Sequence, residues 1–506
     1  MIENNKYKKM KTNKFFLFLI CAIAISACAT DTKIPTLSRK QMQEDIDFLY
    51  STIKNVSPYL TIREQVTGAK LYATLDSLHA CSKDLATFED FYYLASRMLL
   101  LCQDQHNTFQ SFYPMGIENE NPYIHSKSVE ISEICEFMFD KYAPSSNVEV
   151  IYIDGEYFFP ENTYTRISDD RQIFIPEKAK VIKINDVPID EYINYWNRPI
   201  DASVRWDSKN KKYYTYRAYP YSTHKDKLTI TYQLEDTIKT VELNTCEVEG
   251  WFSKDFWDTK INYFDRENIL YLRIAEMDYS LIDSLKKGIW QHKNKSIQKV
   301  IIDVRDNGGG NDMVWREVLS EIVDKPILSQ AKLYLRNTPV VIDYMETIRD
   351  EKLNADLTMR IGDDDFVSLY DEIDTIAPSQ ESILYGGNIY VLVDEKCFSS
   401  TLAFVAVCNQ DARLVTVGNP TGFIGRRGIT PFFFALPHSK LIFEISPTLD
   451  ATMINVPEDY YDHTVDIPVS RSIDDYAFER KYSGERYGKD YLFNHDPVFQ
   501  KVLKIE

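Results

Sequence analysis

Two stretches of the sequence place groups capable of chemistry where a buried strand meets a helix. In the first, the apolar run Val300–Val304 leads into the turn Arg305–Gly310, which ends in three consecutive glycines. Glycines adopt positive φ easily and let another group approach the backbone closely. Backbone N–H groups beside a helix N-terminus suit a phosphate, a carboxylate or a developing oxyanion. The turn therefore predicts an anion-binding site, the alternative being a tight connection without chemistry.

The second stretch offers a hydroxyl nucleophile. The apolar run Ile389–Val393 precedes a turn that contains Ser399 and Ser400, and the apolar helix pattern Thr401–Cys408 follows. A serine here lies where the helix dipole and N–H groups favour negative charge. We expect Ser400 to present its hydroxyl at the edge of the sheet, whereas burial of Ser400 would argue against catalysis. The alternative is a serine that only caps the helix.

The two turns can act together only if their strands share one sheet. Apart from Asp303, both runs consist of apolar residues without alternation, which is typical of parallel strands buried on both faces. Parallel strands bring their carboxyl ends to one edge, where ligands collect in open α/β sheets. We therefore predict that the glycine turn faces Ser400.

The first stretch also carries a family resemblance. The string Ile301–Gly310 resembles the strand-and-glycine signature of the tail-specific, or C-terminal processing, serine proteases and of the related tricorn protease core. The resemblance covers roughly Ile269 to Val469. It implies an α/β fold with a ClpP/crotonase-like protease core, a peptide or protein substrate, and no cofactor or metal.

The nucleophile region resembles the same family. Matching Asp411 to the aspartate that closes the family's helix places Ser400, rather than Ser399, on the nucleophile. The resemblance then implies an oxyanion site built from three backbone N–H groups, those of Gly309, Gly310 and Thr401.

The general base is the point on which two branches of the family differ. In the tail-specific branch a lysine of the following glycine-rich loop is the base, but the loop Gly418–Gly428 contains none. Arginine stays protonated, so we interpret Arg426 and Arg427 as substrate-binding residues. The chain is closer to the tricorn-like branch, which uses serine, histidine and an acid and implies that His106 is the base.

The acid that orients the histidine is expected just before the strand pattern Asp466–Val469. Glu458 is the first choice, with Asp459 and Asp462 behind it. His463, in the same segment, is a rival for the base.

The N-terminus is typical of an export signal. A basic region precedes the apolar stretch Phe15–Ile25, and Ile25-Ser26-Ala27-Cys28 resembles a bacterial lipobox. We expect a lipoprotein signal peptide over residues 1–28, lipidation of Cys28, and a protein anchored to a membrane of the bacterial cell envelope, periplasmic or surface-exposed. The alternative is an ordinary signal peptide cut near Ala29.

The remainder divides by pattern. A capping box of Ser38 and Gln41 opens a helical region. The segment Lys178–Ile189 resembles a PDZ strand and turn, in which Asp186 replaces the usual glycine at a left-handed position. The polar, acidic stretch 340–385 reads as a solvated insertion. The expected parts are a tether (29–37), an N-terminal helical domain (38–125), a PDZ-like β domain (126–250), the catalytic core (260–475) and a C-terminal extension (476–506).

Composition excludes some classes of function. The 506 residues carry a net charge of −18, which argues against a nucleic-acid partner. Outside the signal and Cys28, the cysteines show no C-x-x-C spacing, so zinc is not expected. We therefore predict a cell-envelope lipoprotein serine endopeptidase, with a catalytically inactive peptide- or ligand-binding lipoprotein on the same fold as the alternative.

Overall fold

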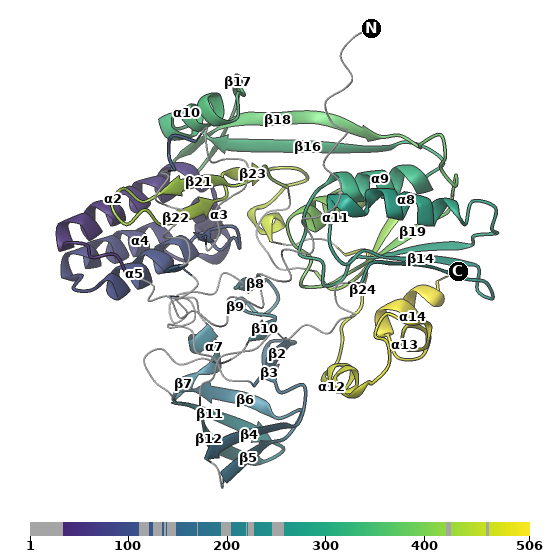
Figure 1. Ribbon diagram of the computed structural model, residues 1–506, viewed down its shortest axis with the longest axis horizontal. Coiled ribbons are helices and arrows are strands. Elements are labelled where there is room, and N and C mark those ends of the chain that lie inside the picture. Colours follow the sequence, from purple (N-terminus) through teal and green to yellow (C-terminus); the bar gives the residue numbers. More distant parts are fainter. Residues whose placement is uncertain are drawn as a thin grey trace, which may run out of the picture. The chain divides into compact units, whose positions relative to one another are not determined.

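The computed structural model describes residues 34–110, 121–124, 134–135, 138, 148–168, 171–193, 204–218, 220, 227–244, 258–420, 427–461 and 465–505. Helices and several separate sheets make up this part of the chain, so the predicted mixed α/β class is confirmed. Figure 1 labels the elements, and these labels are used throughout.

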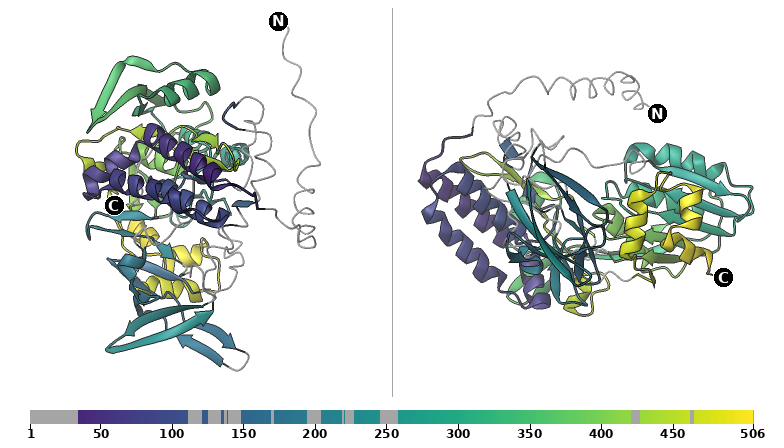
Figure 2. Two further views of the ribbon diagram at one scale, coloured as in Figure 1. Left: turned by 90° about the vertical axis from the view of Figure 1, so that its left-hand side faces the viewer. Right: turned by 90° about the horizontal axis from the view of Figure 1, so that it is seen from below.

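The first described region is helical. It contains α2 (Arg39–Val56), α3 (Tyr59–Thr67), α4 (Leu71–Ala80) and α5 (Phe88–Leu100), which Figure 2 shows side by side. The predicted capping box is confirmed, because Ser38 accepts from the backbone of Gln41 and the Gln41 side chain accepts from Ser38 N–H. After α5 the chain enters the short strand β1 (Thr108–Phe109), which pairs with β22 (Ile442–Ile445), itself paired with β21 (Phe432–Ala435).

A β region follows. Its main sheet has the order β10-β2-β3-β6-β11-β12, formed by Arg217–Ala218, Val150–Ile153, Glu156–Phe158, Lys180–Ile184, Lys227–Leu234 and Thr237–Asn244. The short strand β7 (Val187–Pro188) also pairs with β6. Two hairpins form separate two-stranded sheets, β4–β5 (Thr163–Ser168, Arg171–Ile175) and β8–β9 (Arg205–Asp207, Lys212–Tyr214). Asn185 and Asp186 both have positive φ in the turn after β6, so the predicted left-handed position of Asp186 is confirmed. A PDZ identity for this region stays a prediction.

The core is a sheet of the order β13-β14-β15-β19-β20-β24. Its strands are Lys260–Phe264, Ile269–Arg273, Lys299–Asp303, Ile389–Val393, Leu414–Gly418 and Ile467–Pro468. Every pairing from β14 onward is parallel, and only β13 runs antiparallel to its neighbour. Continuous apolar strands follow from this topology, because both faces of the sheet are covered.

Two layers of helices cover the core sheet (Figure 1). Helices α8 (Ile282–Trp290), α9 (Met313–Ile322) and α11 (Ser400–Cys408) pack on the face that carries Val300, Ile302 and Val391. Helices α13 (Lys489–Asn494) and α14 (Pro497–Leu503) pack on the opposite face. The predicted C-terminal extension, residues 476–506, begins within α12 (Ile473–Lys481) and, through α13 and α14, completes the hydrophobic core.

The interpretation of residues 340–385 as a solvated insertion is wrong. This stretch contains α10 (Pro339–Ile348), β17 (Asn354–Ile361) and β18 (Asp364–Ile376), and β18 pairs with β16 (Ile327–Arg336) in a sheet that β23 (Thr448–Asp450) extends. Much of β18 is open to water, since residues 371–373 are exposed while residues 366–368 are buried, and this explains the polar composition. Asp364 forms an ion pair with the buried Arg336, so it is not a solvated charge.

Two properties bear on location and redox state. None of the helices in the described ranges is both long and apolar enough to cross a membrane. Cys81, Cys102, Cys135, Cys397 and Cys408 all carry free thiols, while Cys246 lies outside the described residues.

Candidate active site

The glycine turn and the serine turn lie at the same edge of the core sheet. Strand β15 pairs in parallel with β19, with Val300 opposite Ile389 and Asp303 opposite Leu392. Both strands therefore end at one carboxyl edge, each running into a helix, α9 and α11. The predicted juxtaposition of the two turns is confirmed.

The contact between the turns is close. A Cβ added at Gly309 would lie 2.6 Å from Ser399 Cβ and 2.7 Å from the carbonyl oxygen of Phe398. Gly309 has a φ of 107°, a conformation that side-chain-bearing residues rarely adopt. Glycine at this position is therefore required by packing as well as by the backbone.

Asn307 ties the two turns together by hydrogen bonds. Its backbone carbonyl accepts from Phe398 N–H at 3.2 Å, and its Oδ1 accepts from Thr401 Oγ1 and Gly309 N–H, each at 2.8 Å. Its Nδ2 donates to the carbonyl of Ile274 at 3.0 Å, and the residue is fully buried. One side chain thus fixes the position of both turns relative to β14.

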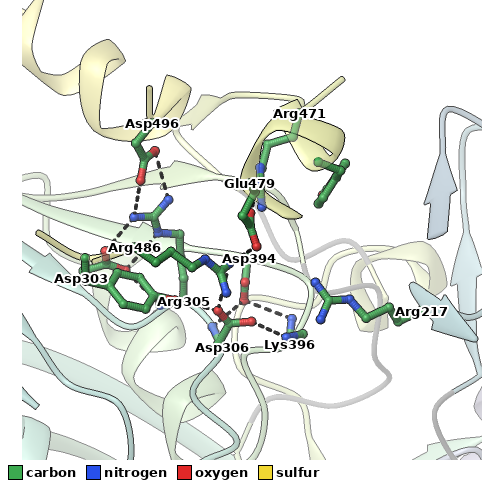
Figure 3. A network of polar contacts seen from close by, with 12 residues as sticks. Arg217, Asp303, Arg305, Asp306, Asp394, Lys396, Arg471, Glu479, Arg486 and Asp496 are labelled. Atoms are coloured by element: carbon green, nitrogen blue, oxygen red, sulfur yellow. Dashed lines mark hydrogen bonds and ion pairs between the residues drawn. The ribbon is translucent and has the colours of Figure 1, made fainter. Parts of the chain in front are cut away.

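Buried charges reinforce the same junction (Figure 3). Asp306, in the glycine turn, forms an ion pair with Lys396, in the serine turn. Asp394 Oδ1 accepts from the backbone N–H of Asp306 and of Lys396, both at 3.0 Å. Burial raises the pKa of Asp306, but the charges of Lys396 and Arg486 outweigh this effect and hold the pKa well below its ordinary value. Asp306 is therefore ionised at neutral pH.

The C-terminal extension contributes the outer part of this network (Figure 3). Arg486 lies 3.2 Å from Asp306 and 3.0 Å from Glu479 of α12. Asp496, at the N-terminus of α14, accepts from both Nη atoms of Arg305, at 3.0 and 2.7 Å. Residues after 470 thereby hold the turn that follows β15.

Ser400 is the first residue of α11 and is only 5% exposed. Its Oγ is buried and has no hydrogen-bond partner among the described residues. The expectation of an accessible hydroxyl is therefore wrong for this state. Ser400 nevertheless lines the pocket described below, so there is space beside the residue although its Oγ is covered.

The three N–H groups expected at an oxyanion site differ in availability. Gly309 N–H donates to Asn307 Oδ1, and Thr401 N–H donates to the Phe398 carbonyl at 3.1 Å. For Gly310 N–H, no hydrogen bond is found within the described ranges. Two of the three expected donors are thus engaged inside the protein, and the oxyanion site is not assembled in this state.

His106 lies between α5 and β1, and its position is set by the preceding turn. Asn107 N–H donates to the Asp104 carbonyl at 2.9 Å, while Asn107 Oδ1 accepts from Ser446 N–H at 2.7 Å. Asp104 Oδ1 accepts from the backbone N–H of His106 at 2.8 Å and lies 2.7 Å from its Nδ1. Because a carboxylate only accepts, Nδ1 carries the proton and neutral His106 keeps a lone pair on Nε2.

The interaction between Asp104 and His106 shifts the pKa of each residue. Burial lowers the pKa of His106, but the charge and hydrogen bond of Asp104 and the charge of Glu444 outweigh it, so the pKa is raised above 6.5. Burial raises the pKa of Asp104, and interaction with His106 outweighs this too, so the pKa is lowered. Glu444, on β22 opposite Thr108, has its pKa raised to about 7 by burial, with the charge of His106 opposing and that of Asp104 adding.

One pocket of about 510 Å³ brings the candidate groups together. Ser400, His106, Asp104 and Gly310 all line it. The ring of Phe398, two residues before Ser400, lies 4.5 Å from the imidazole of His106, centroid to centroid. The helical region and the core sheet therefore form the site jointly.

The basic residues of the pocket are Arg349 and Arg427. Arg427 donates to Ser329 Oγ at 2.6 Å and to the Gln330 carbonyl at 2.9 Å. Arg426, the other expected substrate-binding residue, lies outside the described residues. Arg349, at the end of α10, was not expected from the sequence, because nothing in its local pattern connects α10 with the site.

Glu458 is not among the residues that line this pocket. It lies in the 3-10 turn Pro457–Tyr460, where Asp459 caps the turn by accepting from Val456 N–H. The carboxylate that contacts His106 is Asp104 instead. The choice of Glu458 is corrected for a local reason: a carboxylate two residues before a histidine, on one tight turn, reaches its Nδ1 directly. Asp462 and His463 lie outside the described residues.

Comparison with known proteins agrees with this fold. The sequence model described as Peptidase family S41 matches residues 268–440. No curated protein matches the chain. The crystal structure of mature CPAF is 13% identical and covers 92% of this chain and 97% of its own, with a TM-score of 0.53. Mature CPAF complexed with lactacystin gives 14% identity, coverage of 92% and 98%, and a TM-score of 0.54. At this identity the likeness shows a shared fold.

The close approach at Gly309 generates a testable prediction. Gly309→Ala should lower the free energy of unfolding by about 1–3 kcal/mol, because the new methyl group overlaps Ser399 and Phe398. Gly308→Ala is the matched control, since a Cβ there meets nothing within 4 Å. It should change the free energy of unfolding by less than about 0.5 kcal/mol. Urea unfolding of both variants makes the comparison, and equal values would contradict the packing described.

Proposed function

We propose that this protein is a cell-envelope endopeptidase with Ser400 as nucleophile and His106 as base. The premise is the peptidase family S41 core of residues 268–440, which makes the chain a serine-type peptidase. The match thereby confirms the family resemblance inferred from the glycine string. We further propose that the chain follows the tricorn-like branch, in which a histidine is the base. One observation carries this proposal. Ser400 and His106 line one pocket, and Asp104 holds His106 Nδ1 so that Nε2 is left as the base.

The proposed reaction follows from these groups. Ser400 Oγ attacks the peptide carbonyl carbon while His106 Nε2 takes the hydroxyl proton. The tetrahedral intermediate collapses as His106 returns the proton to the leaving amine, which leaves an acyl-Ser400 ester. Water, deprotonated by His106 in turn, releases the acid. Asp104 stays ionised throughout and stabilises the imidazolium, in place of Glu458.

Catalysis requires a rearrangement of the turns. The Ser400 hydroxyl is buried, and Asn307 Oδ1 occupies Gly309 N–H. We propose that a bound substrate carbonyl displaces Asn307 from Gly309 N–H and meets Gly310 N–H as well, with Thr401 N–H as a third donor. Breaking the Asn307 contacts also loosens the serine turn, because Asn307 joins both turns. The oxyanion site would then form only with substrate present.

The substrate class is a peptide or protein. Arg427 and Arg426 are proposed to bind it, and Arg349 is added to them because it lines the pocket of Ser400. A guanidinium recognises a carboxylate or a backbone carbonyl by directed hydrogen bonds.

The lipobox places the protein at the envelope in this proposal. Lipidation at Cys28 would anchor the mature chain to a membrane, and the net charge of −18 makes attachment through anionic lipid headgroups unfavourable. The lipid therefore supplies the membrane affinity.

The roles of Ser400 and His106 are tested by cleavage of fluorescein-labelled casein. Ser400→Ala and His106→Ala should each lower the rate by about a thousand-fold or more, since they remove the nucleophile and its base. Ser399→Ala is the matched control, because the Ser399 side chain makes no capping hydrogen bond to α11. Full activity of Ser400→Ala or of His106→Ala would contradict the role assigned to that residue.

The Asp104 contact predicts the pH profile. His106 must be neutral to act as the base, so kcat/KM should rise with pH through a midpoint above 6.5. Asp104→Asn should move this midpoint to lower pH, because the charge that raises the pKa of His106 is lost, and should also reduce kcat. Glu458→Gln should leave the profile unchanged. If Glu444→Gln removed the acidic limb, the limb would belong to Glu444 and the assignment to His106 would fail.

The anchor is tested by Cys28→Ser. The variant should leave the membrane fraction or remain unprocessed, because no thiol is left to carry the lipid. Immunoblotting of membrane and soluble fractions measures the outcome. A processed variant that still sediments with membranes would contradict the lipoprotein assignment.

A further inference from the structure

A second pocket, of about 360 Å³, opens at the carboxyl edge of the core sheet and shares no lining residue with that of Ser400. Its core wall is made by residues that follow three neighbouring parallel strands: Glu395 after β19, Asn419 after β20 and Ser470 after β24. Ligands of open α/β sheets bind at this edge, and pockets form preferentially between domains. The position is that of a binding site, separate from the chemistry.

The opposite wall comes from the β region, α12 and Tyr461, and it is aromatic. Six rings line the pocket, those of Tyr152, Trp206, Tyr214, Tyr216, Tyr461 and Tyr476. Their mutual contacts fix them: the Tyr152 and Tyr214 rings stack at 4.4 Å, and the hydroxyls of Tyr216 and Tyr476 lie 2.9 Å apart. Arg471 already lies 4.1 Å from the Tyr476 ring centroid, so the wall holds one cation by its π-face.

Most charges of the pocket have partners inside the protein. Asp154 pairs with Lys209 at 3.2 Å, and Asp207 accepts from Tyr152 and from Asn210. Arg471 forms an ion pair with Glu479.

Glu395 differs from these charged residues. It accepts one hydrogen bond, from Asn419 Nδ2 at 2.7 Å, and across the described ranges no basic residue forms an ion pair with it. Burial raises its pKa to about 7, the charge of Asp394 adds to this, and the charge of Arg205 opposes it at longer range. Asp207 likewise has no basic partner among the described residues, but its carboxylate accepts three hydrogen bonds. Glu395 is therefore the carboxylate of the pocket with neither a counter-charge in contact nor more than one hydrogen bond.

We propose that this pocket binds an organic cation, the ammonium or guanidinium group of a lysine or arginine side chain, with Glu395 as counter-charge and the tyrosine rings around its alkyl stem. A carboxylate among aromatic faces is the combination that recognises such cations. A neutral side chain of the same length gains only the apolar contact.

The site lies next to the machinery of the core without being part of it. Glu395 stands between Asp394 and Lys396, which both contact Asp306 (Figure 3). Binding itself requires neither Ser400 nor His106, so it is measured on the Ser400→Ala protein. Failure of the proposed catalytic roles and failure of this site are thereby distinguished.

The test compares two small probes, Nα-acetyl-lysine methylamide and its neutral analogue Nα-acetyl-norleucine methylamide. Tryptophan fluorescence follows binding, and Trp206→Phe shows which part of the signal comes from the pocket. We expect the lysine probe to bind at least ten-fold more tightly than the norleucine probe. Equal affinities, or no binding of the lysine probe, would overturn the proposal.

Two variants locate the binding. Glu395→Gln should weaken the lysine probe at least ten-fold, whereas Glu242→Gln, an acid on β12 outside the pocket, should not. Ser470→Arg, at an exposed lining position, should abolish binding because the new guanidinium occupies the site, and it keeps the test valid if Glu395→Gln fails to fold. Unchanged affinity in both Glu395→Gln and Ser470→Arg would place the cation elsewhere.

Discussion

The absence of a side chain at Gly309 is the constraint on which the active-site region depends. Two parallel strands bring two turns to one edge, but the turns meet at backbone distance only because Gly309 has no Cβ to separate it from Ser399 and Phe398. Asn307 then bonds to both turns from one buried side chain. At the same junction Gly309 N–H donates to Asn307 Oδ1, and Ser400 Oγ is buried. The contacts that hold the two turns in place thus also restrict the access of a substrate to Ser400. In our proposal, the free energy of substrate binding compensates for breaking these contacts.

The charged network makes that order depend on distant parts of the chain. Buried ion pairs contribute little net free energy of folding, yet loss of one partner costs about 3–5 kcal/mol. Asp306, Lys396 and Arg486 therefore fix where the turns lie more than they raise stability. Because Arg486 and Asp496 belong to the C-terminal extension, the extension is a structural part of the active-site region. The second pocket borders the same network, because its residue Glu395 lies between Asp394 and Lys396 in the chain. A ligand bound in this pocket would therefore lie close to the serine turn.

The sequence predicted what depends on local pattern. Short runs of neighbouring residues determine several features: the strands β15 and β19, the helix after each strand, the capping box at Ser38 and the left-handed Asp186. It could not predict the burial of Ser400, because burial depends on segments that lie far away in the chain. The acidic composition of residues 340–385 did not indicate a strand, because a strand that is partly exposed to solvent can have the composition of a loop. The choice of Glu458 depends on a family pattern near the chain end, whereas the contact of Asp104 with His106 is local and follows from the Asp-x-His spacing.

Covalent labelling of the native protein tests the central claim most directly. A fluorophosphonate reacts only with a serine whose hydroxyl is accessible and activated by a base, so it measures both the opening of the turn and the role of His106. We expect an adduct on the tryptic peptide that contains Ser400, located to Ser400 by tandem mass spectrometry and lost in His106→Ala. An unlabelled native protein, or a label on Ser399, would contradict it. An unlabelled protein would favour the alternative in which the buried Ser400 belongs to an inactive peptide-binding relative.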